Sequence, residues 1–386
     1  MAELSQKTIA VLGSTGSVGT QSLDVARAGN MKVDYISGNS NLRLLEEQIR
    51  EFHPRYCAVA DEKNAKLLAL SVADTDTKIL SGADGVCEGI FLSGAEAVVN
   101  SILGEAGLAP TLAVIESGKR LALSNKESLV IAGDIVMAKV KEKHTQIIPV
   151  DSEHSAIFQS LVGNSNREIK KILLTASGGP FFGKDKDFLR GVMKSDVLAH
   201  PTWKMGAKIT VDSATMMNKG FEVIEAAHLF SVKAEQIQVL VHRESILHSA
   251  VEYIDNAVIA QLGTPDMRLC VQYALTYPER AQSPVRELDL FELGALTFAR
   301  PDTQTFSLLS LAYRALEDKG AMGAVINASN EVAVAAHLSD ALPFYRISEL
   351  VAQCYEQMSY AKKYTSLEDI IASDREARRI TQSLID

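Results

Sequence analysis

The sequence predicts an α/β fold in three parts, mainly because short apolar runs alternate with helical patterns over the first 150 residues. Strands separated by helices of this length form a parallel sheet with helices on both faces. From about residue 151 to 276 the chain mixes strands and helices in an α+β pattern. After Thr305 the apolar residues recur with helical spacing, which predicts a small helical bundle. At 386 residues the chain is also too long for one ordinary core.

The expected elements are apolar runs bounded by turn-forming residues. In the first part we expect strands at 8–12, 32–37, 56–60, 98–103, 121–124 and 146–150, and helices at 20–28, 42–52, 110–117 and 128–143. Later we expect strands at 171–175, 238–241, 250–253 and 258–261, and helices at 306–318, 322–338, 347–361 and from 367 onward. The predicted domains are 1–150, 151–277 and 305–386, with a linker at 278–304 that is rich in proline and charge and lacks a period.

Composition disfavours several classes of protein. The formal net charge of −9 disfavours non-specific attraction to nucleic acid or to an anionic membrane surface. No run approaches the roughly 18 apolar residues of a membrane span. The sequence starts directly into an apolar strand, without a basic segment or cleavage site. Four scattered cysteines without a CxxC pair indicate reduced thiols, so we expect a cytoplasmic protein.

The segment GSTGSVG at 13–19 follows the first strand and opens a helix. Its glycines allow a tight turn and a close approach to a pyrophosphate, as in a Rossmann-like dinucleotide site. The alternative is a strand-to-helix turn without a ligand. The second strand ends in SGNSN at 37–41, without the acidic residue that selects NAD or a cation that selects NADP, although Arg43 is close behind. Local chemistry therefore leaves the choice of cofactor open.

Asp151 and Glu153 follow the last strand of the first part. Residues two apart on an extended segment point the same way, so both carboxylates can face one ion. The alternative makes Asp151 a helix N-cap with Glu153 in the first turn.

A third carboxylate comes from the segment that starts at Asp212. Asn218, Glu222 and Glu225 share one helix face there, with Lys219 beside them, and such a face is usually solvated. Three carboxylates without clustered His or Cys would suit Mg²⁺ or Mn²⁺ rather than zinc.

Three further segments have polar or aromatic residues at strand ends or in loops. Lys126 follows a strand where open parallel sheets bind ligands, or is an exposed lysine in a turn. Ser177 precedes two glycines and can offer a hydroxyl to a phosphate, or belongs to a plain Gly-Pro turn. The loop HPTWKMG at 200–206 holds the one tryptophan and is either a cover over a substrate or a packed corner.

Together these segments resemble the 1-deoxy-D-xylulose 5-phosphate reductoisomerase family. The resemblance runs in order through GSTGSVG, SNKES, PVDSEH, TASGGP, HPTWKMG, VDSATMMNKG, QLGTPDMR and NASNE, and so spans nearly the whole chain. It implies an NADPH-dependent oxidoreductase and isomerase that needs a divalent metal. The implied reaction converts 1-deoxy-D-xylulose 5-phosphate into 2-C-methyl-D-erythritol 4-phosphate, an early step of non-mevalonate isoprene biosynthesis. The resemblance also implies a homodimer.

The resemblance implies a role for each matching residue. The implied metal ligands are Asp151, Glu153 and Glu222. The implied catalytic residues are Lys126, Glu153 and His200. The implied substrate contacts are Lys126, Ser152, Glu153, Ser177, His200, Trp203, Met205, Ser213, Asn218, Lys219 and Glu222. The implied NADPH contacts are Thr15, Gly16, Ser17, Val18, Gly38, Asn39, Ser40, Asn125, Glu127 and Gly206.

Two departures from the family pattern stand out. Asn39 or Ser40 occupies a place where relatives often carry a basic residue, so the residue that contacts the cofactor 2′-phosphate is left undecided. Arg243-Glu244 stands where others have Pro-Gln. Two other hypotheses are a different dehydrogenase, such as a homoserine dehydrogenase-like protein, and a cofactor-binding sensor or inactive scaffold. A different dehydrogenase would not need three metal carboxylates beside a serine-rich phosphate cradle. A sensor or scaffold could lose some of these carboxylates, whereas all three are present here.

Overall fold

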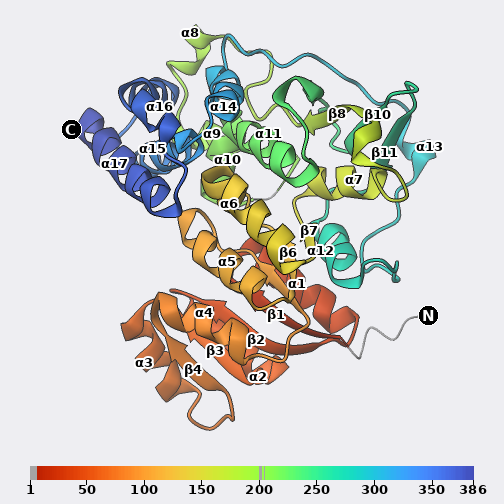
Figure 1. Ribbon diagram of the computed structural model, residues 1–386, viewed down its shortest axis with the longest axis vertical. Helices are drawn as coiled ribbons and strands as arrows, with labels where there is room; N and C mark the ends of the chain where they lie inside the picture. Colours follow the sequence, from red (N-terminus) through yellow and green to blue (C-terminus); the bar gives the residue numbers. More distant parts are fainter. Residues whose placement is uncertain (1–6, 200–201, 204) are drawn as a thin grey trace. The chain divides into compact units, whose positions relative to one another are not determined.

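A computed structural model describes residues 7–199, 202–203 and 205–386 (Figure 1). These residues form two compact units. Unit 1 contains the chain up to Asn125, Val136–Ser155 and Asp266–Arg286. Unit 2 contains Lys126–Ile135, Ala156–Pro265 and Glu287–Asp386. The predicted four-part division by sequence position stays a prediction, since these units are defined by contacts in space.

Unit 1 is built on a parallel sheet, which in the described part of the chain has seven strands in the order β4-β3-β2-β1-β5-β6-β7. The chain starts in the middle, moves outward to β4, then returns and moves outward again from β5. Ligands of such sheets bind beyond the carboxyl ends of the strands where the order reverses, which here is between β1 and β5. The strands are β1 Thr8–Leu12, β2 Lys32–Gly38, β3 Tyr56–Val59, β4 Lys78–Ser81, β5 Ala97–Asn100, β6 Arg120–Leu123 and β7 Ile147–Pro149.

Helices pack against this sheet and bury β1 and its neighbours. Ala10, Val11 and Leu12 of β1 are fully buried, as their apolar run predicts. The first and last helices of the unit, α1 and α12, pack against each other although they are far apart in the sequence. The helices wholly within the unit are α1 Ser17–Ala28, α2 Leu42–Phe52, α3 Glu62–Ser71, α4 Gly82–Leu92, α5 Leu108–Glu116 and α12 Met267–Thr276.

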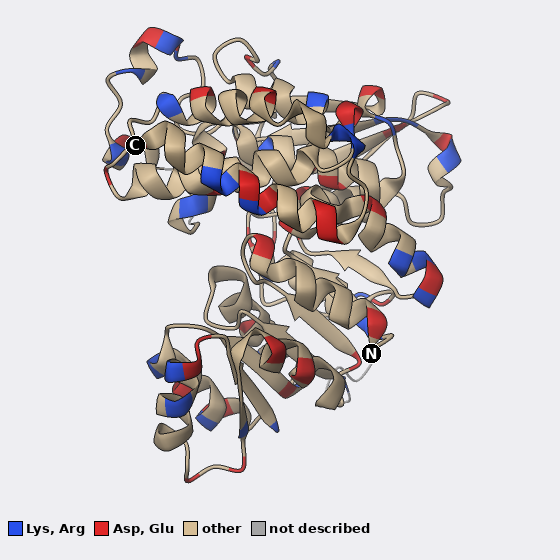
Figure 2. Cartoon of the chain, turned by 60° about the vertical axis from the view of Figure 1, so that its left-hand side comes forward, with Lys and Arg blue, Asp and Glu red and all other residues tan. Residues whose placement is uncertain are grey.

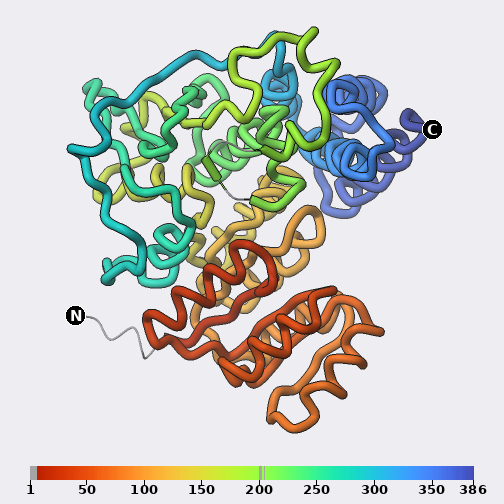
Figure 3. Tube along the Cα trace, turned by 180° about the vertical axis from the view of Figure 1, so that it is seen from behind, coloured from red at the N-terminus to blue at the C-terminus, as the bar shows by residue number. Residues whose placement is uncertain are grey.

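Unit 2 contains a mixed sheet and a helical bundle. Among the described residues its sheet has four strands in the order β11-β10-β8-β9, namely β8 Ile169–Ala176, β9 Ile237–Val241, β10 Leu247–Tyr253 and β11 Val258–Leu262. Only β8 and β9 are parallel. In the bundle, α15 contacts α14, α16 and α17, which are drawn in blue in Figure 3. The bundle helices are α14 Ser307–Asp318, α15 Met322–Leu338, α16 Arg346–Gln357 and α17 Leu367–Ile385. The predicted fold class is therefore confirmed.

The remaining helices connect or cap these parts. They are α6 Glu127–Lys143, α7 Ser152–Ser160, α8 Lys186–Leu189, α9 Lys194–Val197, α10 Ala207–Ala214, α11 Met217–Phe230 and α13 Leu290–Leu293. The prediction of one helix that begins at Asp212 and carries Asn218 and Glu222 is wrong. Met216 has a left-handed φ of 61°, and this residue separates α10 from α11. Asp212 and Ser213 thus belong to the end of one helix, whereas Asn218 and Glu222 belong to the next.

Helix α6 departs from helical geometry at Ala132, where φ is −140°. Figure 2 shows acidic and basic residues interspersed along the chain. None of the helices in 7–199, 202–203 and 205–386 has the length and apolar character needed to span a membrane.

Candidate active site

The turn between β1 and α1 has the geometry that its glycines predict. Gly13 has a φ of 74°, and a Cβ there would lie 2.9 Å from the backbone oxygen of Ser101. Gly16 donates its N–H to the oxygen of Gly13 at 2.9 Å, and a Cβ at Gly19 would overlap that same oxygen. Helix α1 then begins at Ser17, and its N-cap Gly16 supplies no side-chain acceptor. A helix start of this kind favours an anion, as expected for a pyrophosphate site.

The neighbouring strand end, after Gly38 of β2, is held by amide side chains. Asn64 donates to the backbone oxygen of Asn39 at 3.1 Å, and Asn41 caps α2 by accepting from Leu44 at 3.2 Å. Arg43 lies in the first turn of α2, is 91 % exposed, and pairs with Glu47 at 3.0 Å. Arg43 is therefore a cation within reach of solvent near the end of β2.

Asn125, a predicted cofactor contact, follows β6 and has a buried side chain. Its amide nitrogen donates to the backbone oxygens of Ile102 and Gly104 at 2.7 and 2.9 Å. Asn125 thereby fixes the loop that follows β5. A contribution of Asn125 to cofactor binding would therefore act in part through the conformation of this loop.

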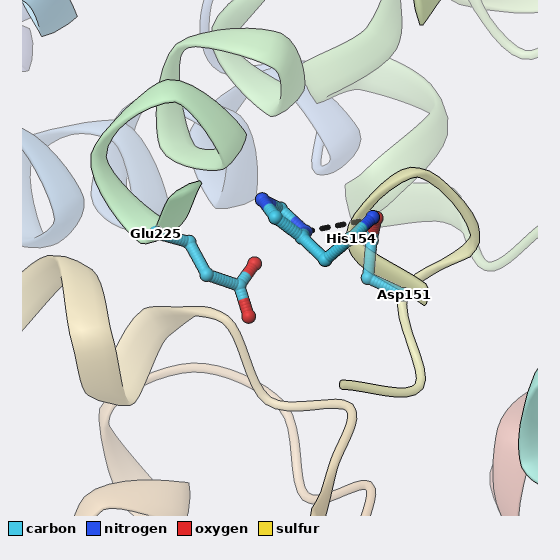
Figure 4. A group of neighbouring side chains, drawn as sticks. All are labelled: Asp151, His154 and Glu225. Carbon is cyan, nitrogen blue, oxygen red and sulfur yellow. Dashed lines mark hydrogen bonds and ion pairs between the residues drawn. The ribbon is translucent and has the colours of Figure 1, made fainter. Parts of the chain in front are cut away.

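Asp151 is the N-cap of α7, as the alternative hypothesis states. Its Oδ1 accepts from the backbone N–H of Glu153 at 3.1 Å and of His154 at 3.4 Å. The Nδ1 atom of His154 lies 3.1 Å from the same oxygen (Figure 4). Ser152 donates its hydroxyl to Glu153 Oε2 at 2.5 Å. Capping and metal binding are compatible, because these contacts of Asp151 all use Oδ1 and hold the carboxylate in one orientation.

Glu222 of α11 is surrounded by nitrogen donors within unit 2. Only 1 % of its side chain is exposed, and Lys126 Nζ lies 3.0 Å from Oε1. Lys219 pairs with Oε2, and the Asn218 amide donates to Oε1 at 2.5 Å. The alternative of a solvated face does not hold, because α11 is buried on almost every side, including at Glu225. Two ammonium groups thus flank one buried carboxylate.

The Ser177 loop follows β8 and lies against the end of α10. Gly178 and Gly179 have left-handed φ values of 76° and 65°, which glycine adopts without strain. A Cβ at Gly179 would lie 2.8 Å from the backbone oxygen of Ser213. The structure therefore brings together two segments predicted to hold the substrate phosphate.

A buried ion cluster next to these residues is missing from the sequence prediction. Lys208 Nζ lies 3.0 Å from Glu127 and 2.9 Å from Asp212, and Asn330 of α15 donates to Asp212 at 2.7 Å. Burial alone would raise the pKa of Glu127, but the Lys208 ammonium, a backbone hydrogen bond and Lys126 together outweigh burial and lower it. Burial would lower the pKa of Lys208, and its two carboxylate partners raise it instead. Glu127 is thus held as a carboxylate by Lys208.

The 200–206 segment is described only in part, and His200, a predicted catalytic residue, lies outside the described residues. Trp203 and Met205 are half-buried, and Gly206 is the N-cap of α10. The Trp203 ring lies 6.1 Å from the ring of His248, measured between centroids. Trp203 therefore has an aromatic neighbour in unit 2, which fits both a closing cover and a packed corner.

Comparison with known proteins places this chain. Models of 1-deoxy-D-xylulose 5-phosphate reductoisomerase match residues 9–133, and models of its C-terminal domains match 147–230 and 262–380. The chain belongs to the 1-deoxy-D-xylulose 5-phosphate reductoisomerase family. The reductoisomerase of Acetivibrio thermocellus is 50% identical over 98% of this chain and 99% of its own length. That of Agathobacter rectalis is 50% identical over 96% of this chain and 97% of its own.

Solved structures of the family agree with the fold. A DOX-P reductoisomerase in complex with NADPH, fosmidomycin and magnesium has a TM-score of 0.91 and 39% identity, and each chain covers 98% of the other. The Zymomonas mobilis reductoisomerase in complex with NADPH has a TM-score of 0.91 and 38% identity, covering 98% of this chain and 99% of its own. The predicted family is confirmed, and with it the prediction of an NADPH-dependent oxidoreductase.

Proposed function

We propose that this chain converts 1-deoxy-D-xylulose 5-phosphate into 2-C-methyl-D-erythritol 4-phosphate with NADPH and Mg²⁺ or Mn²⁺, in isoprene biosynthesis. Family membership supports the reaction as a whole. The observation that carries the proposal for this chain is the Glu222 cluster, a buried carboxylate held by two lysines and an amide. Such a cluster combines a metal ligand with cations for a phosphorylated, negatively charged substrate.

The proposed metal ligands are Asp151, Glu153 and Glu222, each of which offers a carboxylate oxygen. Oxygen donors alone fit a hard divalent ion. His154 and Ser152 would hold the first two carboxylates in place through the hydrogen bonds described above. When bound, the metal polarises the substrate's carbonyl and hydroxyl oxygens and the nicotinamide supplies a hydride.

The proposed phosphate contacts are Ser177, Ser213, Asn218 and Lys219, all of unit 2. The close approach of Gly179 to Ser213 supports a shared site for the two serines. Lys219 supplies the cation and lies one residue from Asn218 on α11. Anchoring the phosphate away from the reacting carbons orients the substrate, and such binding energy contributes to the rate.

Lys126 and Glu153 are the proposed groups that hold and move protons at the substrate oxygens. Lys126 Nζ is fixed by Glu222 at 3.0 Å and by the Asn218 side-chain oxygen at 3.1 Å. A positioned ammonium can hold a proton at a substrate oxygen while the C3–C4 bond breaks and the carbon skeleton rearranges. His200 stays a predicted catalytic residue, and Trp203 and Met205 stay predicted cover residues that exclude water.

The proposed NADPH site starts at the glycine turn. Thr15, Gly16, Ser17 and Val18 would contact the pyrophosphate, which the tight turn and the helix start support. The other proposed contacts are Gly38, Asn39 and Ser40 at the end of β2, and Asn125, Glu127 and Gly206 elsewhere. Glu127 would act together with Lys208, since the two are paired.

A cytoplasmic homodimer is the proposed form of the enzyme. Strand β11 is the edge of its sheet and exposes Val258, Ile259 and Leu262 at 54%, 43% and 38%. An exposed apolar edge strand of this kind is a template for pairing with another chain. The four cysteines are free thiols, which suits a reducing compartment.

The decisive experiment measures NADPH oxidation with 1-deoxy-D-xylulose 5-phosphate, with Mg²⁺, with Mn²⁺ and with a chelator. We expect oxidation only when both substrate and metal are present, and stoichiometric formation of 2-C-methyl-D-erythritol 4-phosphate. Absence of turnover with either metal at saturating substrate would refute the proposal.

A further inference from the structure

The loop that joins β9 to β10 contains the Arg243-Glu244 departure and adjoins the Ser177 loop. Because β8 and β9 are parallel and pair Ala176 with Val241, the residues after both strands emerge at the same edge of the sheet. Ser177 begins one of these loops, and Arg243 lies two residues into the other.

Arg243 binds the backbone of the Ser177 loop. Its Nη1 atom donates to the carbonyl oxygen of Gly179 at 2.8 Å and to that of Ser177 at 3.3 Å. Its guanidinium also lies 5.2 Å from the centre of the Phe182 ring, which in turn is in reach of Gly178. These contacts hold a loop whose two left-handed glycines would otherwise be easily deformed.

The orientation of the loop follows from the planar peptide group. The C=O of Ser177 and the N–H of Gly178 belong to one trans peptide and point in opposite directions. When Arg243 binds the C=O on one side, the N–H faces the other side. A backbone N–H beside the Ser177 hydroxyl is a suitable donor to a phosphate oxygen.

The position of Arg243 is itself fixed by its neighbours. The Thr297 hydroxyl donates to Glu244 at 2.6 Å, and Val241 pairs with Ala299 in both directions at 2.9 Å. His242 accepts the backbone N–H groups of Ile246 and Leu247 at its Nε2 atom, at 3.2 and 3.1 Å. Arg243 therefore projects from a turn that is tied down on both sides.

We infer that Arg243 is a positioning residue for the substrate phosphate: it binds the carbonyls of the Ser177 loop and so presents the loop's donors to the phosphate. The inference rests on the proposed function, since it takes the Ser177 loop as the phosphate site. It predicts a selective effect on substrate binding, because Arg243 contacts neither the Glu222 cluster nor the glycine turn in the interactions that define those sites.

The test compares Arg243→Gln and Arg243→Lys with Arg167→Gln, an exposed arginine of the same unit, and with Ser177→Ala. We expect Arg243→Gln to raise the KM for 1-deoxy-D-xylulose 5-phosphate about tenfold, as for loss of charged hydrogen bonds, with kcat and the KM for NADPH within about twofold. Arg243→Lys should recover part of this loss, because it keeps the charge and a donor. Arg167→Gln should match the wild type.

The outcomes separate the inference from the function on which it rests. An unchanged substrate KM in both Arg243 variants, with a raised KM in Ser177→Ala, overturns the inference and leaves the proposed function intact. An unchanged KM in Ser177→Ala overturns the phosphate site and the inference with it. If Arg243→Gln does not fold, Arg243→Lys decides: we expect a KM raised about threefold, and a lower melting temperature without a change in KM would show a purely structural role.

Discussion

Glu222 lies 3.0 Å from the ammonium nitrogen of Lys126, and only 1 % of its side chain is exposed. Lys219 contacts the second carboxylate oxygen, so each oxygen has its own cation. In a site that excludes water, two ammonium groups held close together depend on the carboxylate between them. Glu222 thus stabilises two buried lysines in addition to its proposed role as a metal ligand.

Glu222→Gln should therefore lose most activity and some stability. We expect kcat/KM to fall at least about 100-fold, because a proposed metal ligand is lost. We expect the free energy of unfolding to fall by about 3 kcal/mol, because Lys126 and Lys219 lose their buried partner. The measurements are turnover at saturating Mg²⁺ and urea denaturation.

Asp151→Asn is the matched variant for the same site. Asparagine also caps helices well, so α7 should remain and stability should change by less than about 1 kcal/mol. Activity should fall as in Glu222→Gln, since the negative charge of a proposed metal ligand is again removed. Near-normal turnover of both variants at saturating metal would show that these carboxylates do not bind the ion.

Lys208→Met should destabilise the enzyme more than any ordinary surface change. Lys208 is the shared partner of Glu127 and Asp212, whose side chains are 8% and 2% exposed. Its removal leaves two buried carboxylates without their cation, at a cost of about 3–5 kcal/mol in unfolding free energy by urea titration. Lys233→Met, at a side chain 78% exposed, should cost less than about 0.5 kcal/mol. Equal stability of the two variants would mean that the Lys208 pairs contribute no net stability.

Much of the fold could be predicted because apolar runs and turn residues bound its elements. The predicted limits of β1, α2 and α15 agree with the structure. The region 62–92 was not predicted. Helix α4 contains three glycines, which lowers helix propensity, and β4 is a short edge strand with little buried surface.

The positions of Lys126 and Ser177 after strands β6 and β8 could be predicted from the sequence, whereas their roles stay predictions. Burial of α11 could not be predicted, because Lys219, Glu222 and Glu225 look like a solvated face until their tertiary partners are known. The Lys208 cluster depends on Glu127 and Asn330, which are distant in sequence. Its one local signal is the i, i+4 spacing of Lys208 and Asp212.

Stability should depend on His228 at mildly acidic pH. Its ring packs against Gly133 of α6, and burial lowers its pKa despite the nearby carboxylate of Asp134 at 3.5 Å. The unfolded chain then binds a proton that the folded His228 does not. Stability is highest above the unfolded pKa of about 6.5 and is lost as pH falls from there through the lower folded pKa.

The measurement is the melting temperature between about pH 5 and 8. His228→Gln should show a smaller fall in melting temperature across this range than the wild type. His53→Asn removes an exposed histidine at a left-handed position that asparagine tolerates, and it should keep the wild-type slope. A wild-type slope in His228→Gln would contradict the assignment.

Arg43 is the proposed cation for the cofactor 2′-phosphate. It lies in the first turn of α2, after the end of β2, and its exposed pair with Glu47 is weak enough to exchange for a phosphate. We expect the wild type to prefer NADPH over NADH at least about tenfold in kcat/KM, and Arg43→Ala to lose most of that ratio.

Arg50→Ala, on the last turn of the same helix, should keep the wild-type ratio. Equal efficiency with both cofactors in the wild type would refute the preference for NADPH. A preference that persists in Arg43→Ala would instead exclude Arg43 alone and direct attention to other residues near the β2 end.

Trp203 is the only tryptophan of the sequence, so its fluorescence reports one loop without a label. The side chain is half-buried beside His248. If the loop covers the substrate, fosmidomycin with Mg²⁺ should shift the emission to the blue, because the indole passes into a drier environment. The response should be much weaker without metal, since the hydroxamate group of fosmidomycin then lacks the ion that it chelates.

Trp203→Phe should keep the fold and some activity, whereas Trp203→Ala should lose more activity because water can enter. Emission that is already blue in the free enzyme, and that does not respond to fosmidomycin shown to bind by calorimetry, would identify Trp203 as a packed corner residue.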